Sequence, residues 1–118
     1  VEKMKQGNKV IDYYAEPIMH ELLSEKDFGK YQDKETGKMQ LCFLTNNDIT
    51  GGNSGSPMFN GKGELIGLAF DGNWDSLSSD INFDKRLARC IGVDIRYVLY
   101  LMDKWGHADR LIKEINAK

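Results

Sequence analysis

The residues whose types and spacing could do chemistry lie in one short string, residues 50–57, which reads Thr-Gly-Gly-Asn-Ser-Gly-Ser-Pro. A serine between glycines can act as a nucleophile if its loop exposes the hydroxyl. The elbow of an α/β-hydrolase needs glycine where Ser56 stands and a helix where Pro57 begins a strand-like run. A phosphate-binding loop needs four residues between its glycines, and Gly55 and Gly61 are separated by five. Two interpretations are left. The string is either the nucleophile loop of an acyl-transfer enzyme or a glycine-rich turn without a catalytic role.

The pattern Gly-x-Ser-Gly-x-Pro before a strand is typical of the nucleophile loop of chymotrypsin-type serine peptidases, and residues 52–57 match each fixed position. That chemistry needs two backbone N–H groups converging about 3 Å from the developing oxyanion. We expect Ser54 to be the nucleophile, with the N–H groups of Gly52 and Ser54 forming the oxyanion hole, because glycine relieves strain in such a loop. Asn53 replaces the usual aspartate, so neutral hydrogen bonds are expected to hold the loop.

A serine peptidase also needs a histidine base and an acid that orients it. The sequence has two histidines. His20 falls in a helical stretch and is predicted to be a surface or helix-packing residue, and His107 is predicted to be a solvent-facing turn or cap residue. In the chymotrypsin-type fold the base and acid come from a preceding barrel. We therefore expect residues 1–118 to be a single C-terminal fragment of a longer peptidase, inactive by itself.

Composition excludes several other classes of function. The 118 residues are 41% hydrophobic and 29% charged, which is typical of one globular domain. No apolar run approaches the roughly 18 residues that cross a membrane, and a net charge of −2 argues against nucleic-acid binding. Neither a metal nor a cofactor is expected. Cys42 and Cys90 fall in strands that can be neighbours, and we expect two buried free thiols, with a disulfide as the alternative.

Hydrophobic periodicity and turn residues divide the chain into predicted elements. Pro17 either kinks a helical stretch over residues 9–28 or begins a second helix there. Asp94 can cap a later helix, Gly106 can end it, and Trp105 is expected to pack in the core. The predicted strands are 39–44, 56–59, 64–70 and 89–93, with a hairpin at 60–63, loops at 29–38, 45–55 and 71–86, and a short last helical stretch at 111–115.

Three separated motifs narrow the resemblance from chymotrypsin-type serine peptidases in general to one family. They are Asn-Asp-Ile-Thr-Gly-Gly-Asn-Ser-Gly-Ser-Pro at 47–57, Gly-Glu-Leu-Ile-Gly-Leu-Ala-Phe-Asp-Gly-Asn-Trp at 63–74 and Val-Asp-Ile-Arg-Tyr-Val-Leu at 93–99. Together with Lys-Asp-Phe-Gly-Lys-Tyr at 26–31, they resemble the C-terminal part of the bacterial dipeptidyl-peptidase 7 and dipeptidyl-peptidase 11 family of serine peptidases. The resemblance is closer to the dipeptidyl-peptidase 7 type and covers most of residues 22–112.

This resemblance implies a mixed, mainly β fold with flanking helices. Residues 1–38 would be a helical and loop lead-in. Residues 39–118 would hold strands of the second β-barrel of a chymotrypsin-like double barrel, the nucleophile loop and the C-terminal helix. The implied partners are a peptide or oligopeptide substrate and the upstream barrel of the same chain. Half of a two-barrel enzyme exposes the surface that met the other half, so self-association is also expected. The implied location is the periplasm or cell envelope of a bacterium.

The resemblance also implies roles for the residues around residue 71. Asp71 would bind the free α-ammonium of the substrate through a charge-assisted hydrogen bond. Gly72 falls where acidic-specific relatives carry arginine, so it would leave an open, uncharged pocket for a hydrophobic residue before the cut. Phe70 and Trp74 complete the expected substrate-binding residues. From the residues alone, the alternative for Asp71 and Gly72 is a turn aspartate and its positive-φ glycine, and Trp74 could be core or site.

The expected function is that of a serine-type dipeptidyl aminopeptidase, which releases dipeptides from peptide N-termini. One alternative is a generic trypsin-like endopeptidase fragment, and another is a non-catalytic interaction module that kept the loop as a scaffold. Asp71 argues against the first alternative, because an endopeptidase gains nothing from a carboxylate facing the substrate chain. A histidine and an aspartate upstream of Val1 would argue against the second.

Overall fold

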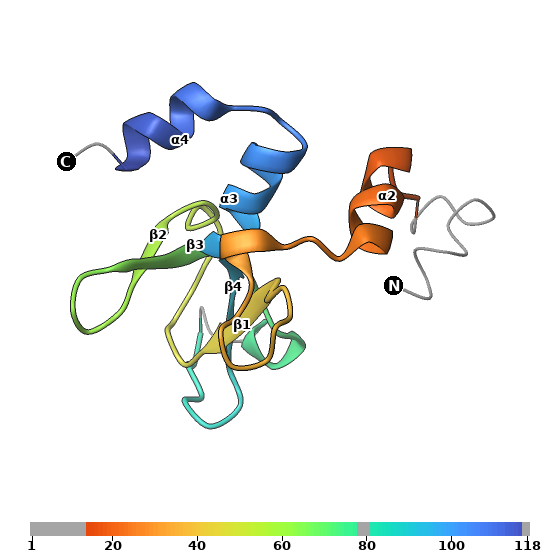
Figure 1. Cartoon of the computed structure of the whole chain (residues 1–118). Coiled ribbons are helices and arrows are strands. Elements are labelled where there is room, and N and C mark those ends of the chain that lie inside the picture. Colours follow the sequence, from red (N-terminus) through yellow and green to blue (C-terminus); the bar gives the residue numbers. More distant parts are fainter. Residues whose placement is uncertain (1–13, 78–80, 117–118) are drawn as a thin grey trace.

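The computed structural model describes residues 14–77 and 81–116. Within these residues four strands form one antiparallel sheet in the order β1-β4-β3-β2, so β1 and β2 lie at its edges (Figure 1). The architecture is mixed, with helices flanking the sheet, as predicted; its place in a chymotrypsin-like double barrel stays a prediction. The elements are α2 (Pro17–Glu25), η3 (Gly29–Tyr31), β1 (Cys42–Thr45), β2 (Pro57–Phe59), β3 (Leu65–Gly72), η4 (Trp74–Ser76), β4 (Cys90–Asp94), α3 (Ile95–Lys104) and α4 (Asp109–Asn116).

Most elements lie close to their predicted positions, with shifts at their ends. Pro17 occupies the first turn of α2, which confirms the second alternative for this proline. Residues 9–13 of the predicted helical stretch lie outside the described residues. The predicted strand from residue 39 begins at Cys42 instead. The hairpin at 60–63 joins β2 to β3, and β3 continues through Gly72 rather than ending two residues earlier.

The centre of the sheet is built around the ring of Phe43 on β1. A Cβ atom at Gly92 of β4 or at Gly67 of β3 would lie 2.6 Å from a ring carbon of Phe43. Glycine normally weakens a strand interior, and it is retained where another group must approach the backbone closely. These two glycines therefore let one aromatic ring from β1 pack across β4 and β3.

α3 begins where the sequence predicted. The Arg96 N–H donates to Asp94 Oδ1 at 2.8 Å, so Asp94 caps the helix. The buried side chain of α3 is Tyr100, whose ring meets those of Phe28 and Tyr31 edge-on, at centroid separations of 5.9 and 6.2 Å. These contacts fasten the segment that follows α2 to the helix that follows β4.

The end of α3 differs from the prediction. α3 ends at Lys104, and Trp105 is 42% exposed, so the expected core packing of this tryptophan is wrong. The left-handed residue of the turn is His107, with φ of 46°, rather than Gly106. His107 is exposed, as predicted for a turn residue. Because α3 stops before Trp105, the side chain leaves the face that packs on the sheet.

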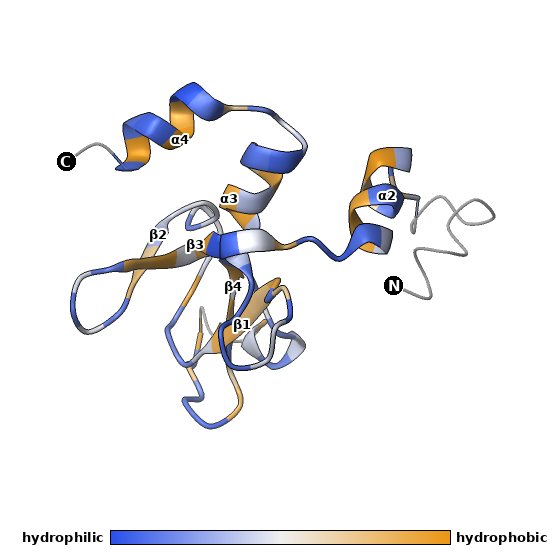
Figure 2. Ribbon diagram, viewed as in Figure 1, coloured by the Kyte–Doolittle hydropathy of each residue, from blue (hydrophilic) through white to orange (hydrophobic). Residues whose placement is uncertain are grey.

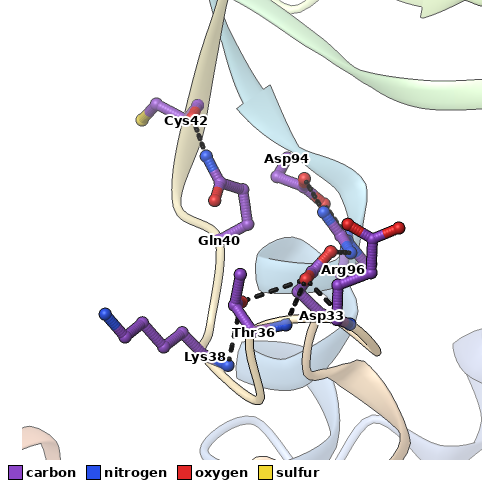
Figure 3. A network of polar contacts seen from close by, with 8 residues as sticks. Asp33, Thr36, Lys38, Gln40, Cys42, Asp94 and Arg96 are labelled. Carbon is purple, nitrogen blue, oxygen red and sulfur yellow. Dashed lines mark hydrogen bonds and ion pairs between the residues drawn. The ribbon is translucent and has the colours of Figure 1, made fainter.

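Asp33, Asp94 and Arg96 form a closed ionic cluster beside the start of α3 (Figure 3). The Arg96 guanidinium donates to both carboxylate oxygens of Asp94, at 3.0 and 2.8 Å, and to Asp33 at 3.1 Å. The Thr36 backbone N–H, followed by the Arg96 guanidinium, lowers the pKa of Asp33 to about 2. The cluster fastens the loop after η3 to the junction of β4 and α3.

Few apolar side chains are fully buried in the described residues. The buried hydrophobic residues are Tyr31, Ala69, Ala88, Cys90 and Tyr100. Apolar residues run along the strands and parts of each helix (Figure 2). The exposed large ones are Tyr14, Leu41, Leu44, Phe59, Leu65, Phe70, Trp74, Leu77, Ile81, Leu87, Trp105, Leu111 and Ile115. Such surfaces are typical of faces that another body covers, and self-association stays a prediction.

Cys42 and Cys90 lie on the neighbouring strands β1 and β4. Both are free thiols, as expected, but only Cys90 is buried, so the prediction of two buried thiols is wrong for Cys42. Cys42 pairs with Val93 and Cys90 with Thr45, which places the two sulfurs at opposite ends of the strand pair. Among the described residues, no helix is both long enough and apolar enough to cross a membrane.

Candidate active site

Neutral hydrogen bonds within the loop hold the segment that carries Ser54. The Asn53 carboxamide oxygen accepts the Thr50 N–H at 3.0 Å, and the Asn53 N–H donates to the Thr50 carbonyl at 3.1 Å. The Ser56 N–H donates to the Asn53 carbonyl at 3.0 Å. The prediction that neutral contacts of Asn53 replace an ionic anchor is confirmed.

The loop is fastened to β3 on its far side. The Gly55 N–H donates to the Ala69 carbonyl at 2.7 Å, and the Ala69 N–H donates to the Ser56 carbonyl at 2.8 Å. Gly55, with φ of +85°, occupies the left-handed region that favours glycine. As a result Ser54 is exposed beside the end of β3, with its Oγ 3.5 Å from the Phe70 carbonyl oxygen. That separation is long for a hydroxyl donor, so the Ser54 hydroxyl is weakly held.

The backbone around Ser54 has two of the features that an oxyanion hole needs, a left-handed glycine and unused N–H donors. Gly52 has φ of +96°, a conformation that would strain other residues. The N–H groups of Gly52 and Ser54 donate no hydrogen bond to any part of the chain that the structure describes. Two such donors beside an exposed serine can receive a developing negative charge. Their role in catalysis stays a prediction.

A shallow cavity of about 210 Å³ opens beside Ser54 at the end of β3. Four of the six predicted site residues line it together: Ser54, Phe70, Asp71 and Gly72. The other lining residues are Ile49, Thr50, Gly51, Ser76 and Leu77. Gly52 and Trp74 do not line the cavity. Trp74 is 85% exposed in η4, so its alternative role as a core residue is wrong.

Asp71 and Gly72 belong to β3, which overturns the interpretation of both as turn residues. They pair with Ile91 and Cys90 of β4, after an irregularity in register between Ala69 and Asp71. In a regular strand Asp71 would share the face of the buried Ala69, since side chains alternate. The irregularity frees Asp71 from that face and leaves it exposed at the cavity.

The hydrogen bonding of Asp71 leaves one carboxylate oxygen available. Oδ1 accepts the Gly72 N–H at 2.8 Å, and Oδ2 accepts no hydrogen bond from the described residues. A carboxylate in this state can accept a charge-assisted hydrogen bond from a ligand ammonium.

The two histidines do not contribute to this cavity. His20 lies in α2, and neither His20 nor His107 lines the cavity. In the described parts of the chain, no three His, Cys, Asp or Glu side chains gather as metal ligands.

Other residues fill the space into which a side chain at Gly72 would extend, and the open, uncharged pocket stays a prediction. A Cβ atom at Gly72 would collide with Oγ of Ser76, lie 3.2 Å from the Ser76 Cβ and lie 3.7 Å from Ile49 Cγ2. Gly72 also lacks the positive φ expected of a turn glycine. Sequence reasoning missed Ser76, because only the turn of η4 returns it to the strand end four residues earlier.

Comparison with known proteins places the chain in one family. The family profile of peptidase S46 matches residues 1–117. The chain belongs to the peptidase S46 family. This S46 chain is 55% identical over 112 residues to the dipeptidyl-peptidase 7 of Porphyromonas endodontalis, an alignment that covers 95% of the chain and 13% of that protein. It is 64% identical over 97 residues to the dipeptidyl-peptidase 7 of Phocaeicola vulgatus, covering 82% of the chain and 13% of that protein.

A solved structure agrees with the sequence comparison. The crystal structure of Porphyromonas endodontalis DPP11 in complex with the dipeptide Arg-Glu matches with a TM-score of 0.89 and 37% identity, covering 98% of this chain and 17% of that one. The resemblance drawn from the three motifs is thereby confirmed. This S46 chain spans 13–17% of the length of these three relatives.

Proposed function

We propose that this S46 chain carries the nucleophile and the amine-binding carboxylate of a longer serine dipeptidyl aminopeptidase. The observation that carries the proposal is that Ser54 and Asp71 line the same shallow cavity. The relatives named dipeptidyl-peptidase 7 support the reaction class. A hydroxyl and a carboxylate in one cavity suit a substrate that is bound at its end and cut close to that end.

The chemistry divides between the two groups. Ser54 Oγ attacks the carbonyl carbon of the second peptide bond from the substrate's N-terminus, and a base elsewhere in the longer enzyme accepts its proton. The free N–H groups of Gly52 and Ser54 stabilise the oxyanion that forms. The free Oδ2 of Asp71 accepts from the α-ammonium and fixes where the substrate begins. The oxyanion then collapses, the C–N bond breaks, and the rest of the peptide leaves as an amine that takes the proton from the base. Water hydrolyses the acyl-enzyme, which releases the dipeptide and restores the Ser54 hydroxyl.

The composition of the cavity supports a hydrophobic residue before the cut. Among the described residues that line it, Ile49, Phe70 and Leu77 are apolar, and Asp71 alone is charged. An acidic substrate side chain would face this carboxylate without a cation to pair with, whereas an apolar side chain loses nothing by leaving water. Trp74 is close in sequence and exposed, and we place it at the rim for longer substrates.

The remaining parts of the enzyme follow from what the chain leaves exposed. We place the histidine base and its acid on an upstream barrel that also covers the exposed apolar faces, which would otherwise drive self-association. Location in the periplasm or cell envelope of a bacterium is part of the same proposal and is supported by the family likeness alone.

Removing the carboxylate of Asp71 tests the proposal. In the longer enzyme, Asp71→Ala should lower kcat/KM for a peptide with a free N-terminus by roughly 10- to 100-fold, the value of a lost charge-assisted hydrogen bond. An acetylated peptide of the same sequence should be cleaved poorly by both proteins. The control is Asp75→Ala, which removes a nearby exposed carboxylate that does not line the cavity.

Three outcomes separate the candidate functions. A fall in the free-to-acetylated ratio in Asp71→Ala alone supports the dipeptidyl aminopeptidase. Equal cleavage of both peptides by the wild type indicates an endopeptidase. Absence of turnover in the wild type, with no difference from Ser54→Ala, indicates a non-catalytic module.

A further inference from the structure

Ser76 fills the space that the absence of a side chain at Gly72 would otherwise leave. Of the atoms around a Cβ built at Gly72, the nearest two belong to the Ser76 side chain. Both residues line the cavity beside Ser54. The Ser76 hydroxyl therefore occupies the volume that a side chain at Gly72 would need.

Ser76 is held in this position by a rigid turn. Its Oγ donates to the Asn73 carbonyl at 2.6 Å, and its N–H donates to the same oxygen at 2.9 Å. Asn73 is fastened in turn to the segment that enters β4. The Asn73 N–H donates to the Arg89 carbonyl at 2.9 Å, and the Asn73 side chain accepts the Arg89 N–H at 2.8 Å and donates to the Leu87 carbonyl at 2.9 Å. A turn with five such bonds does not yield easily to a larger neighbour.

We propose that Ser76 is a specificity-determining residue of this chain, and that residues 72 and 76 share one volume in the wall of the cavity. The inference rests on the proposed function, since it concerns the pocket for the residue before the cut. A smaller residue at position 76 deepens the pocket, and a larger residue at position 72 fits only when position 76 is reduced. The two positions therefore set specificity jointly.

A double-mutant cycle in the longer enzyme tests the inference through specificity. The measured quantity is the ratio of kcat/KM for dipeptide reporters with Phe and with Ala before the cut. Ser76→Gly should raise the ratio about tenfold, since a small change in the volume of an apolar pocket is worth 10-fold or more. Gly72→Ala should lower it by a similar factor. The double variant should return to within about threefold of the wild type, because one change removes the volume that the other adds.

Ser76→Ala is the conservative variant, and it should raise the ratio less than Ser76→Gly does, because it keeps the Cβ atom. A ratio that Ser76→Gly leaves unchanged, or a double variant whose ratio stays as high as that of Ser76→Gly or as low as that of Gly72→Ala, would overturn the inference.

Thermal unfolding separates this inference from the proposed function. The four proteins are the wild type, Ser76→Gly, Gly72→Ala and the double variant. Gly72→Ala should lower Tm by roughly 2–4 °C when position 76 is serine, and by less when it is glycine. This coupling requires no activity. If the wild type releases no dipeptide, the proposed function fails while the Tm cycle still decides whether the two residues share one volume. Equal Tm losses in both backgrounds would overturn the inference whatever the activity.

Discussion

Two polar clusters lie at opposite ends of the β3–β4 pair and are built in opposite ways. At one end Asp94 pairs with Gly67, and both carboxylates of the Asp33–Asp94–Arg96 cluster contact the same guanidinium. At the other end, where Gly72 pairs with Cys90, the Ser54 hydroxyl is 3.5 Å from its acceptor and Asp71 uses one oxygen. In the first cluster the charged groups are paired with one another, whereas in the second cluster hydrogen-bonding groups are left without a partner among the described residues.

This difference distinguishes residues that stabilise the fold from residues whose polar groups are available to bind a ligand. Polar groups that are buried are normally paired, because leaving them unpaired costs stability. Asp94 is 6% exposed and is fully engaged. Ser54 and Asp71 are exposed, so their spare hydrogen-bonding capacity costs little until a substrate arrives. Variants at the two ends should therefore affect different properties.

The largest expected effect is the loss of activity when the chain is separated from the rest of the enzyme. Neither histidine lines the cavity of Ser54, and a triad without its base loses on the order of 10⁴–10⁶ in turnover. The purified 118-residue chain should therefore give no signal above buffer with a fluorogenic dipeptide substrate that the longer enzyme cleaves. Turnover by the isolated chain that disappears in Ser54→Ala would show that the base lies within these residues.

Removing the Asp94 carboxylate, at the end of the β3–β4 pair that carries the ionic cluster, should instead affect stability. Asp94→Ala deletes a helix cap, worth about 1 kcal/mol, and leaves Arg96 without its buried partner, so α3 should lose about 2–3 kcal/mol of local stability. Asp94→Asn keeps the cap and should lose less. Hydrogen exchange of the α3 amides in the longer enzyme measures both effects.

The matched control for Asp94 is Asp84→Ala. Asp84 also pairs with an arginine two residues later, but Arg86 is 87% exposed, and surface pairs contribute little. Its loss should leave exchange in α3 unchanged. If Asp94→Ala left exchange unchanged and abolished turnover, the division between the two ends of the sheet would be wrong.

Much of this division could be predicted from the sequence where the signal is local. Asp94 before an amphipathic run predicts a cap, Pro17 predicts a first turn, and the glycines around Ser54 predict an exposed nucleophile. These features depend on residues that are adjacent in the chain. Asn53 belongs with them, because the Asn53 amide contacts a residue three positions away.

The parts that could not be predicted depend on contacts between distant segments. Nothing near Asp71 in the sequence indicates the irregular register with β4 that exposes it. The volume shared by Gly72 and Ser76 needs the η4 turn, and the contact of Asp33 with Arg96 joins residues 63 positions apart. The spacing of Trp105 predicts a core residue, but the helix stops before it. Periodicity gives the face of an element and not its end.

The smallest expected effect is a pH dependence of the ionic cluster. The pKa of Asp33 is lowered to about 2 in the folded chain, against about 3.9 when unfolded. A lowered pKa means that the stabilisation by Asp33 is fully present above about pH 4 and is lost as pH falls through about 2. Asp33→Asn, which keeps an acceptor for Thr36 but removes the charge, should therefore lower Tm at pH 5 and have little effect near pH 2.

Tm of the wild type and of Asp33→Asn, measured in the longer enzyme between pH 5 and pH 2, checks this expectation. The control is Glu35→Gln, a neighbouring exposed carboxylate that forms no ion pair in the described residues. Its difference from the wild type should stay nearly constant over the range. Because Asp33 contacts Arg96 and not the cavity, kcat/KM at pH 7 should be the same in Asp33→Asn as in the wild type. A constant Tm difference for Asp33→Asn, or a fall in its kcat/KM, would show that the Asp33 charge does not act through the cluster.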